Sequence, residues 1–304
     1  MESRTFFLAA AVAALLLLAG CFGGGAPAPG NGKLLVVASF YPLYDFARNV
    51  GGDRVAVSVL IPPGVEPHDY EFSPSDARNV GDADVFLYNG AGLEPWVTQL
   101  LEGIGNPDLR AVDTSANVSL VSSQDPDAPG SDPHVWLDPI LAKKQVEAIR
   151  NAFIEKDPDG AAEYEANAAA YLAKLDALDA ALRSGLAHCQ RRDVFITHAT
   201  LAYFCKEYDC AQFPIEGVNA EAEPLPGDLA SFIRKAKADN ATTVFAEPQF
   251  DPRAAQTIAS EINGSVAVFN SVHGLTAQQQ AAGEDYISLM NENVQALING
   301  LGCG

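Results

Sequence analysis

Three histidines stand at positions from which they could bind one metal ion. The chain holds only five histidines among 304 residues. His68 lies in a loop after a strand-like run, His198 directly follows another, and His134 lies in a loop rich in aspartate and proline. Ligands of open α/β sheets bind at the carboxyl ends of the strands, so we expect these loops to converge. Neutral imidazole suits Zn²⁺ and other late first-row divalent ions, and the pattern therefore predicts a metal site.

The sequence leaves the fourth ligand open. Glu247 and Asn270 each directly follow a strand-like run, and His273 lies just past the last of these runs. Three neutral imidazoles carry no charge, so a nearby carboxylate would favour a divalent cation. Carboxylates close to these positions in sequence are Glu66, Asp69, Asp138 and Glu247. A lone histidine is more often structural than a ligand, and His188, beside a charged turn, is expected at the surface.

Short apolar runs that alternate with helix-like segments must position these residues. The run over residues 34–38 is continuously apolar, which is typical of a strand buried on both faces. Further strand-like runs cover residues 55–61, 84–88, 109–112, 194–197, 211–215, 243–246 and 266–269. Strands that alternate with helices predict parallel sheets covered on both faces.

The longest periodic segment lies midway along the chain. Apolar residues recur at steps of three and four from Tyr164 to Leu186, and charged residues occupy the opposite face. Such a helix could join two lobes, or it could be an ordinary crossover helix within one sheet. We expect an α/β protein with two parallel-sheet lobes joined by a single long helix, and the metal site in the cleft between the lobes.

The N-terminus has the pattern of a targeting segment. Arg4 precedes an apolar run over residues 6–18, which is short for a transmembrane span and typical of a signal peptide. The small residues before Cys21 resemble the lipobox of prokaryotic lipoproteins, in which the cysteine becomes the lipidated first residue. An uncleaved anchor, or a signal with an incidental cysteine, is the alternative. Residues 22–32, rich in glycine, alanine and proline, predict a flexible tether.

Charge and cysteine content narrow the class of protein. The net charge of −20 argues against nucleic-acid binding, which needs a basic surface. Four cysteines follow the lipobox, and an even number outside the cytoplasm suggests disulfides, with three possible pairings. Cys205 and Cys210 could close a small loop, which would leave Cys189 with Cys303. A thiolate metal site is the rival interpretation.

The motifs around the three histidines closely resemble those of the zinc/manganese ABC-transporter substrate-binding proteins. Residues 67–76 around His68 resemble the first ligand motif of that family, residues 132–139 around His134 the second, and residues 197–208 around His198 the third. Residues 247–250 and 286–297 also match. The resemblance runs in order from residue 33 to the end, with the lipobox in the expected place.

This resemblance implies two α/β lobes joined by one long rigid helix, with a metal held between them for a membrane permease powered by an ATPase. Histidine at the third ligand position, here His198, is typical of the members of the family that bind zinc, whereas the members that bind manganese tend to have glutamate there. The usual fourth ligand is an aspartate after the last strand, where this chain has Asn270. Zinc members often carry a histidine-rich loop before the second motif, but residues 122–132 contain no histidine.

The expected function is a lipid-anchored, extracytoplasmic, high-affinity Zn²⁺ receptor of an ABC importer. We expect a monomer that is not an enzyme, with the permease and its ATPase as partners. The alternatives are an Mn²⁺ or Fe²⁺ receptor of the same family, a secreted zinc hydrolase and a surface adhesin. The expected division is a signal peptide over 1–20, the lipidated cysteine and tether over 21–32, a first lobe over 33–156, a linking helix over 157–188 and a second lobe over 189–304.

Overall fold

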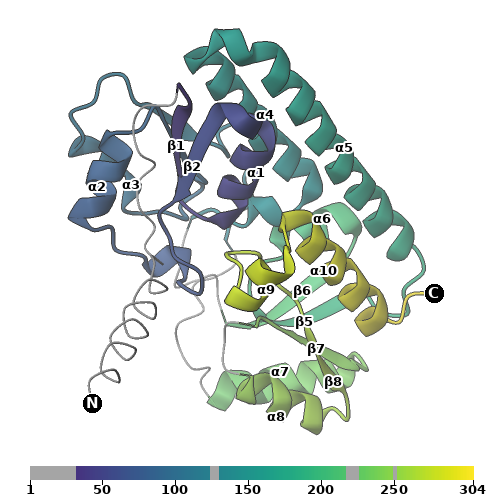
Figure 1. The fold of residues 1–304 in the computed structure, drawn as a ribbon. Coiled ribbons are helices and arrows are strands. Elements are labelled where there is room, and N and C mark those ends of the chain that lie inside the picture. Colours follow the sequence, from purple (N-terminus) through teal and green to yellow (C-terminus); the bar gives the residue numbers. More distant parts are fainter. Residues whose placement is uncertain (1–31, 124–129, 217–225, 249–251) are drawn as a thin grey trace, which may run out of the picture.

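The computed structural model describes residues 32–123, 130–216, 226–248 and 252–304. Within these ranges, eight strands form two four-stranded sheets whose strand pairs are all parallel (Figure 1). The predicted signal peptide, Cys21 and residues 249–250 of the fourth matching segment lie outside the described residues.

The first sheet has the strand order β2-β1-β3-β4. Its strands are β1 (Leu34–Ala38), β2 (Val55–Val59), β3 (Val85–Tyr88) and β4 (Arg110–Asp113). Its helices are α1 (Tyr41–Gly51), α2 (Pro74–Gly81), α3 (Val97–Glu102) and α4 (Pro139–Lys156). The apolar run of β1 lies between two neighbouring strands, with Val36 and Ala38 fully buried. A strand in this position needs no polar face.

The second sheet repeats this topology, with the order β6-β5-β7-β8. Its strands are β5 (Asp193–His198), β6 (Ala211–Glu216), β7 (Thr243–Ala246) and β8 (Ser265–Val268). Its helices are α6 (Ala202–Tyr208), α7 (Pro226–Ala238), α8 (Arg253–Glu261), α9 (Ala277–Ala282) and α10 (Tyr286–Leu301). The strand order reverses between β5 and β7, and such a switch point is where α/β sheets bind ligands.

A single long helix joins the two sheets, as predicted. Helix α5 (Ala161–Gly185) contacts α1 and α4 beside the first sheet and α10 beside the second (Figure 1). The prediction began the helix at Asp157, but residues 158–160 form a separate 3₁₀ turn before it. Asp157 is held there by Arg54, whose Nε and one terminal nitrogen donate to the carboxylate at 2.9 and 2.7 Å. The fold class is therefore two parallel-sheet lobes connected by one long helix.

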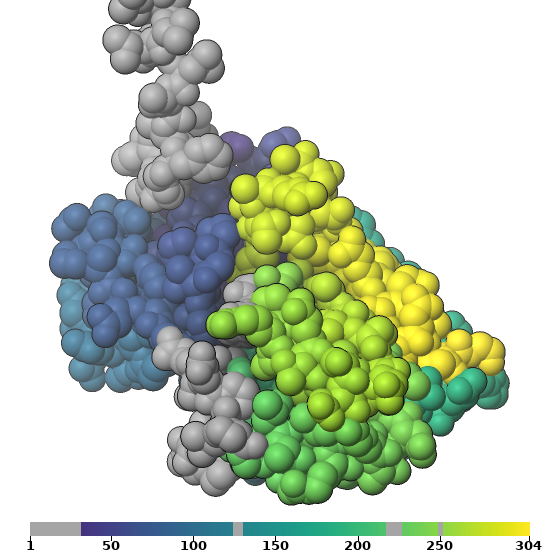
Figure 2. Space-filling view, turned by 90° about the horizontal axis from the view of Figure 1, so that it is seen from below, coloured from purple at the N-terminus to yellow at the C-terminus, as the bar shows by residue number. Residues whose placement is uncertain are grey.

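The lobes pack directly on each other. One cluster of buried apolar side chains extends from β1 through α5 to β7 and α10. Figure 2 shows the green and yellow part of the chain, which holds the second sheet, lying against the blue first part. In the described ranges, no helix combines the length and apolar character needed to cross a membrane.

Candidate metal centre

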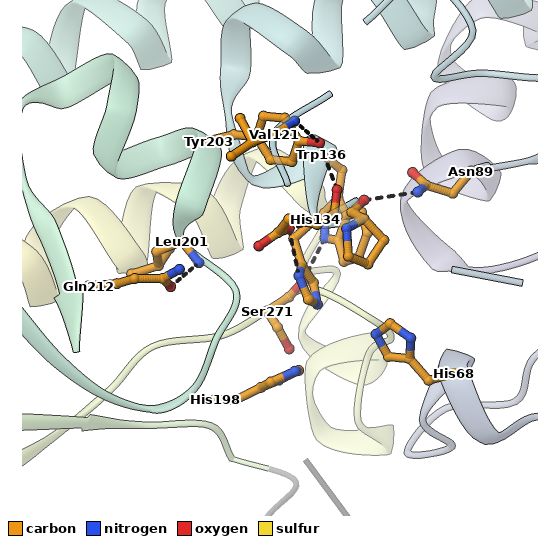
Figure 3. A network of polar contacts seen from close by, with 12 residues as sticks. His68, Asn89, Val121, His134, Trp136, His198, Leu201, Tyr203, Gln212 and Ser271 are labelled. Carbon is orange, nitrogen blue, oxygen red and sulfur yellow. Dashed lines mark hydrogen bonds and ion pairs between the residues drawn. The ribbon is translucent and has the colours of Figure 1, made fainter. Parts of the chain in front are cut away.

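The three predicted histidines meet where the lobes face each other. His68 lies in a 3₁₀ turn after β2, His134 directly precedes the 3₁₀ turn Val135–Leu137, and His198 is the last residue of β5. One nitrogen from each ring lies within 4.8 Å of the other two (Figure 3). His134 and His198 are fully buried, and the side chain of His68 is 8% exposed. Two loops of the first lobe and one strand end of the second thus bring three imidazoles together.

Two carboxylates fix which ring nitrogen carries the proton. Asp132 Oδ1 lies 3.0 Å from His134 Nδ1, and Glu247 Oε1 lies 2.9 Å from His198 Nδ1. An ionised carboxylate can only accept, so Nδ1 must donate in both pairs. In both rings the lone pair is then on Nε2, which is the nitrogen that would bind a metal ion.

Burial keeps the imidazoles of His68 and His134 neutral. Burial, together with smaller contributions from the neighbouring His134 and His198, lowers the pKa of His68 to about 2. The pKa of His134 is also lowered by burial, against the opposing effect of Asp132. Metal ions bind the neutral imidazole, so protons compete weakly at this site.

Several buried polar atoms at this site have no hydrogen-bond partner in the described part of the chain. They are Nε2 of His68, Nε2 of His134 and Oε1 of Glu66. Leaving such a group unsatisfied costs about 1–3 kcal/mol, and each one in a native protein calls for an explanation. Glu66 Oε1 lies 4.0 Å from His68 Nε2, and burial raises the pKa of Glu66 to about 7. A cation held by these atoms would satisfy them.

Glu247 and Asn270 have their side-chain oxygens engaged elsewhere. Glu247 accepts from His198 through Oε1 and from Ser271 through Oε2. Burial raises the pKa of Glu247, but the interactions with His198, His273 and Ser271 together outweigh it, so that the pKa is lowered and this carboxylate is an anion. Asn270 Oδ1 accepts from the amide of Val272 at 2.7 Å, which holds a tight loop.

His273 is the remaining predicted candidate. The centroid of its ring lies 6.3 Å from those of both His134 and His198. Its Nδ1 lies 3.1 Å from Ser271 Oγ and 3.5 Å from Glu66 Oε2. Burial lowers its pKa to about 3, against the opposing effect of Glu247. His273 is therefore a neutral ring beside those of His134 and His198.

The backbone before His273 is strained. Val272 has φ +60°, in the left-handed region that a β-branched residue rarely adopts. The conformation is held from two sides. Asn270 accepts from Val272, and Asn293 of α10 both accepts from the Asn270 amide and donates to its carbonyl, at 2.8 and 2.7 Å. Strain of this kind persists where surrounding bonds over-determine it, often at functional sites.

Aromatic residues whose roles the sequence did not reveal hold the site together. Trp136 Nε1 donates to the Ser271 carbonyl at 2.8 Å, and Tyr286 donates to the Trp136 carbonyl at 2.5 Å. Tyr203 of α6 donates to the Asp132 carbonyl at 2.6 Å (Figure 3). All three bonds cross between the lobes. These aromatic residues lie inside the matching motifs, and this was the only sign of their role that the sequence contained. The sequence contained no such sign for Ser271.

Other predicted polar residues have structural positions. Asp138 Oδ1 accepts from the Ile140 amide at 2.8 Å and caps α4. Asp76 forms a capping box with Ser73 at the start of α2. His188 is exposed, as predicted.

The four later cysteines form two disulfides. Cys205 is bonded to Cys210, directly after α6, and Cys189 to Cys303 near the C-terminus. No cysteine sulfur of these pairs is therefore available as a metal ligand.

A cavity of about 440 Å³ adjoins the histidine cluster. Residues 63–66 line one side of it, and residues 273–280 line the other. Glu66, Asn270 and His273 reach it from the site. His273 is the one histidine of the cluster among its lining residues in the described part of the chain.

Known proteins with related sequences bind zinc. The chain is 34% identical over 304 residues to the high-affinity zinc uptake system protein ZnuA of Bacillus subtilis, covering 95% of each. It is 34% identical over 278 residues to the zinc-binding lipoprotein AdcA of Streptococcus pneumoniae, covering 88% of this chain and 56% of that protein.

Solved structures of related proteins share the fold. The crystal structure of the Zn(II)-bound ZnuA-like domain of Streptococcus pneumoniae AdcA matches with TM-score 0.80 and 34% identity, over 89% of this chain and 99% of that one. A mutant structure of the laminin-binding adhesin Lmb of Streptococcus agalactiae matches with TM-score 0.80 and 27% identity, over 88% of this chain and 98% of that one. The profile of the family ZnuA, zinc-uptake complex component A periplasmic, matches residues 36–300. The chain therefore belongs to this family.

Proposed function

We propose that the chain is an extracytoplasmic receptor that binds Zn²⁺ with high affinity and delivers it to an ABC importer. The carrying observation is the meeting of His68, His134 and His198 within 4.8 Å, from both lobes. The zinc bound by the related AdcA domain supports the same ligand. The ion is cargo, and we propose that the protein is not an enzyme.

We propose His273 as the fourth ligand. The oxygens of Glu247 and Asn270 are engaged in the bonds described above, whereas the ring of His273 adjoins two of the three other rings. Four imidazoles would complete the tetrahedral shell that zinc prefers in closed sites. Glu66 and Glu247 then supply negative charge around a neutral ligand set.

The donor atoms favour zinc over manganese or iron. Mn²⁺ prefers carboxylate, carbonyl and water ligands, whereas imidazole suits Zn²⁺. A set of four nitrogens therefore supports the zinc assignment and argues against an Mn²⁺ or Fe²⁺ receptor.

We propose that Cys21 is lipidated and holds the protein at the outer face of the cell membrane, with the permease and its ATPase as partners. The name of the relative AdcA, a zinc-binding lipoprotein, supports the anchor. We also propose the lobe boundaries given above, since α5 is the described helix that packs on both lobes.

The two other classes of function make different demands. A zinc hydrolase needs an open coordination position and a poised general base, and a fourth imidazole would fill that position. An adhesin is suggested by the likeness to Lmb. Binding of laminin that persists after removal of the metal would favour that function.

Calorimetry on the purified protein, stripped with a chelator, tests the proposal. We expect tight binding of one Zn²⁺ and much weaker binding of Mn²⁺. His68→Ala, His134→Ala and His198→Ala should each weaken zinc binding by at least about 100-fold, because each removes a donor atom. His188→Ala, which changes an exposed histidine, is the matched control. Wild-type affinity in all three ligand variants would refute the site.

A further inference from the structure

Ser271 lies between a buried anion and the proposed fourth ligand. It is fully buried in the loop after β8, where its main-chain carbonyl already accepts from Trp136. Its hydroxyl contacts two side chains at once. It donates to Glu247 Oε2, and it lies 3.1 Å from His273 Nδ1.

The direction of these bonds fixes the state of His273. A serine hydroxyl has one proton and two lone pairs. Because the proton goes to Glu247, the oxygen can only accept from His273, whose Nδ1 must then carry the ring proton. Glu66 Oε2, 3.5 Å from the same nitrogen, is also an acceptor. The lone pair of His273 is thereby placed on Nε2.

We infer that Ser271 is a positioning residue for His273. Glu247 orients the ring of His198 directly, and through the hydroxyl of Ser271 it also orients the ring of His273, so that Nε2 of His273 can bind the metal. This inference rests on the proposed function. Glu247 contacts His198 directly through Oε1, and its Oε2 accepts from the serine hydroxyl, which in turn lies 3.1 Å from His273 Nδ1. One buried carboxylate thus orients two imidazoles of the second lobe.

The arrangement also explains why this chain has a strained loop. Val272, at φ +60°, separates Ser271 from His273 and turns the chain so that both side chains of this pair come together. The hydrogen bond from Trp136, a residue of the first lobe, holds the main chain of Ser271 in place. Replacing Ser271 by alanine removes the hydroxyl but leaves that main-chain bond possible, so the substitution isolates the side-chain role.

Zinc affinity in a double-mutant cycle tests the inference. We expect Ser271→Ala to weaken Zn²⁺ binding by about 10–100-fold, as loss of an orienting partner of a metal ligand does. In a His273→Ala background the same change should have no further effect, because the two act as one unit. Equal affinity of Ser271→Ala and wild type, or losses that simply add, would overturn it.

A matched control separates this role from general loss of stability. Ser115 is also buried and donates to a carboxylate, Asp113, at 3.0 Å, but it lies after β4 in the first lobe. Ser115→Ala should unfold somewhat more easily and bind zinc as wild type does. If it weakened zinc binding as much as Ser271→Ala, the effect would be structural and the inference wrong.

A measurement on the unmodified protein needs no variant to fold. Nitrogen-15 NMR of the imidazoles, in protein stripped of metal, distinguishes a proton on Nδ1 from one on Nε2. We expect His273 to carry it on Nδ1, and a proton on Nε2 would overturn the inference. Absence of zinc binding by the wild-type protein would instead refute the proposed function, so the two failures are distinguishable.

Discussion

At the scale of single residues, the site is defined by where protons sit. Asp132 and Glu247 each accept from the Nδ1 of a histidine, and Ser271 does so for a third. Each ring is thus left with a lone pair on the opposite nitrogen, which is the one a metal needs. The chemistry of the site lies as much in these acceptors as in the rings.

Removing the charge of Glu247 tests this view. Glu247→Gln keeps an oxygen that can accept from His198 but loses the negative charge that stabilises a bound dication. We expect zinc affinity to fall by about 10–100-fold, measured by competition with a chromophoric chelator. Glu155→Gln, at an exposed ion pair with Arg110, is the control and should bind as wild type. An unchanged affinity for Glu247→Gln would show that the carboxylate does not support the ligands.

At the scale of elements, the strands were predictable and the loops were not. The eight strand-like runs match the observed strands to within two residues at each end. Strands such as β1 and β3 are short, continuous apolar segments that are mostly buried, whereas every residue of β6 and β8 is half-buried or exposed. Helix α9 has no apolar face that the sequence could reveal, since its six residues are all glutamine or alanine and none is buried. The motifs identified His68, His134 and His198 because each is tied to a strand end or a capped helix start.

The sequence left three candidates for the fourth ligand, Asn270, Glu247 and His273, for a physical reason. The loop from Asn270 to His273 depends on a positive φ at Val272 and on bonds from Asn293, which is distant in sequence. Neither follows from local propensity, because a β-branched residue avoids that conformation. The strand order and the bonds of Trp136 across the lobes likewise depend on tertiary packing.

The contact between α1 and α5 predicts how stability depends on pH. Asp45 of α1 is buried and accepts from the hydroxyl of Tyr171 on α5 at 2.7 Å. Burial raises its pKa to about 6, although the Tyr171 bond opposes this. A carboxyl whose pKa is higher in the folded state favours folding when protonated, and this contribution is lost as pH rises through the folded value.

The Asp45→Asn variant should therefore become more stable relative to wild type as pH rises. Asparagine keeps an acceptor for Tyr171 and never ionises. Between about pH 4 and pH 7 we expect the free energy of unfolding of wild type to fall relative to the variant by up to roughly 3 kcal/mol. Urea unfolding at a series of pH values, with chelator present, measures this difference. A difference that is constant with pH, or that changes in the other direction, would contradict the prediction.

At the scale of the whole molecule, the two lobes are held as one body. Helix α5 packs on both, and the bonds of Trp136, Tyr203 and Tyr286 cross between them beside the metal site. Domains linked only by a small polar interface are expected to move, but here the apolar core is continuous from one lobe to the other.

We accordingly expect zinc to change the overall shape very little. Small-angle X-ray scattering of stripped and zinc-loaded protein should give the same radius of gyration within error. Trp136→Phe, which removes the donor to Ser271, should enlarge the stripped protein. Trp96→Phe should not, because Trp96 Nε1 has no partner among the described residues. A clear contraction of the wild-type protein on adding zinc would show that the lobes move as separate bodies.

The disulfide between Cys189 and Cys303 has a consequence for resistance to proteolysis. The two cysteines are 114 positions apart, and between them lies the whole second sheet with its helices. This part of the chain is therefore a covalent ring. A protease that cuts it once, at any bond between the two cysteines, opens the ring but releases no fragment. A singly nicked receptor would keep every imidazole of its site on one molecule until a reductant or a second cut separated the pieces.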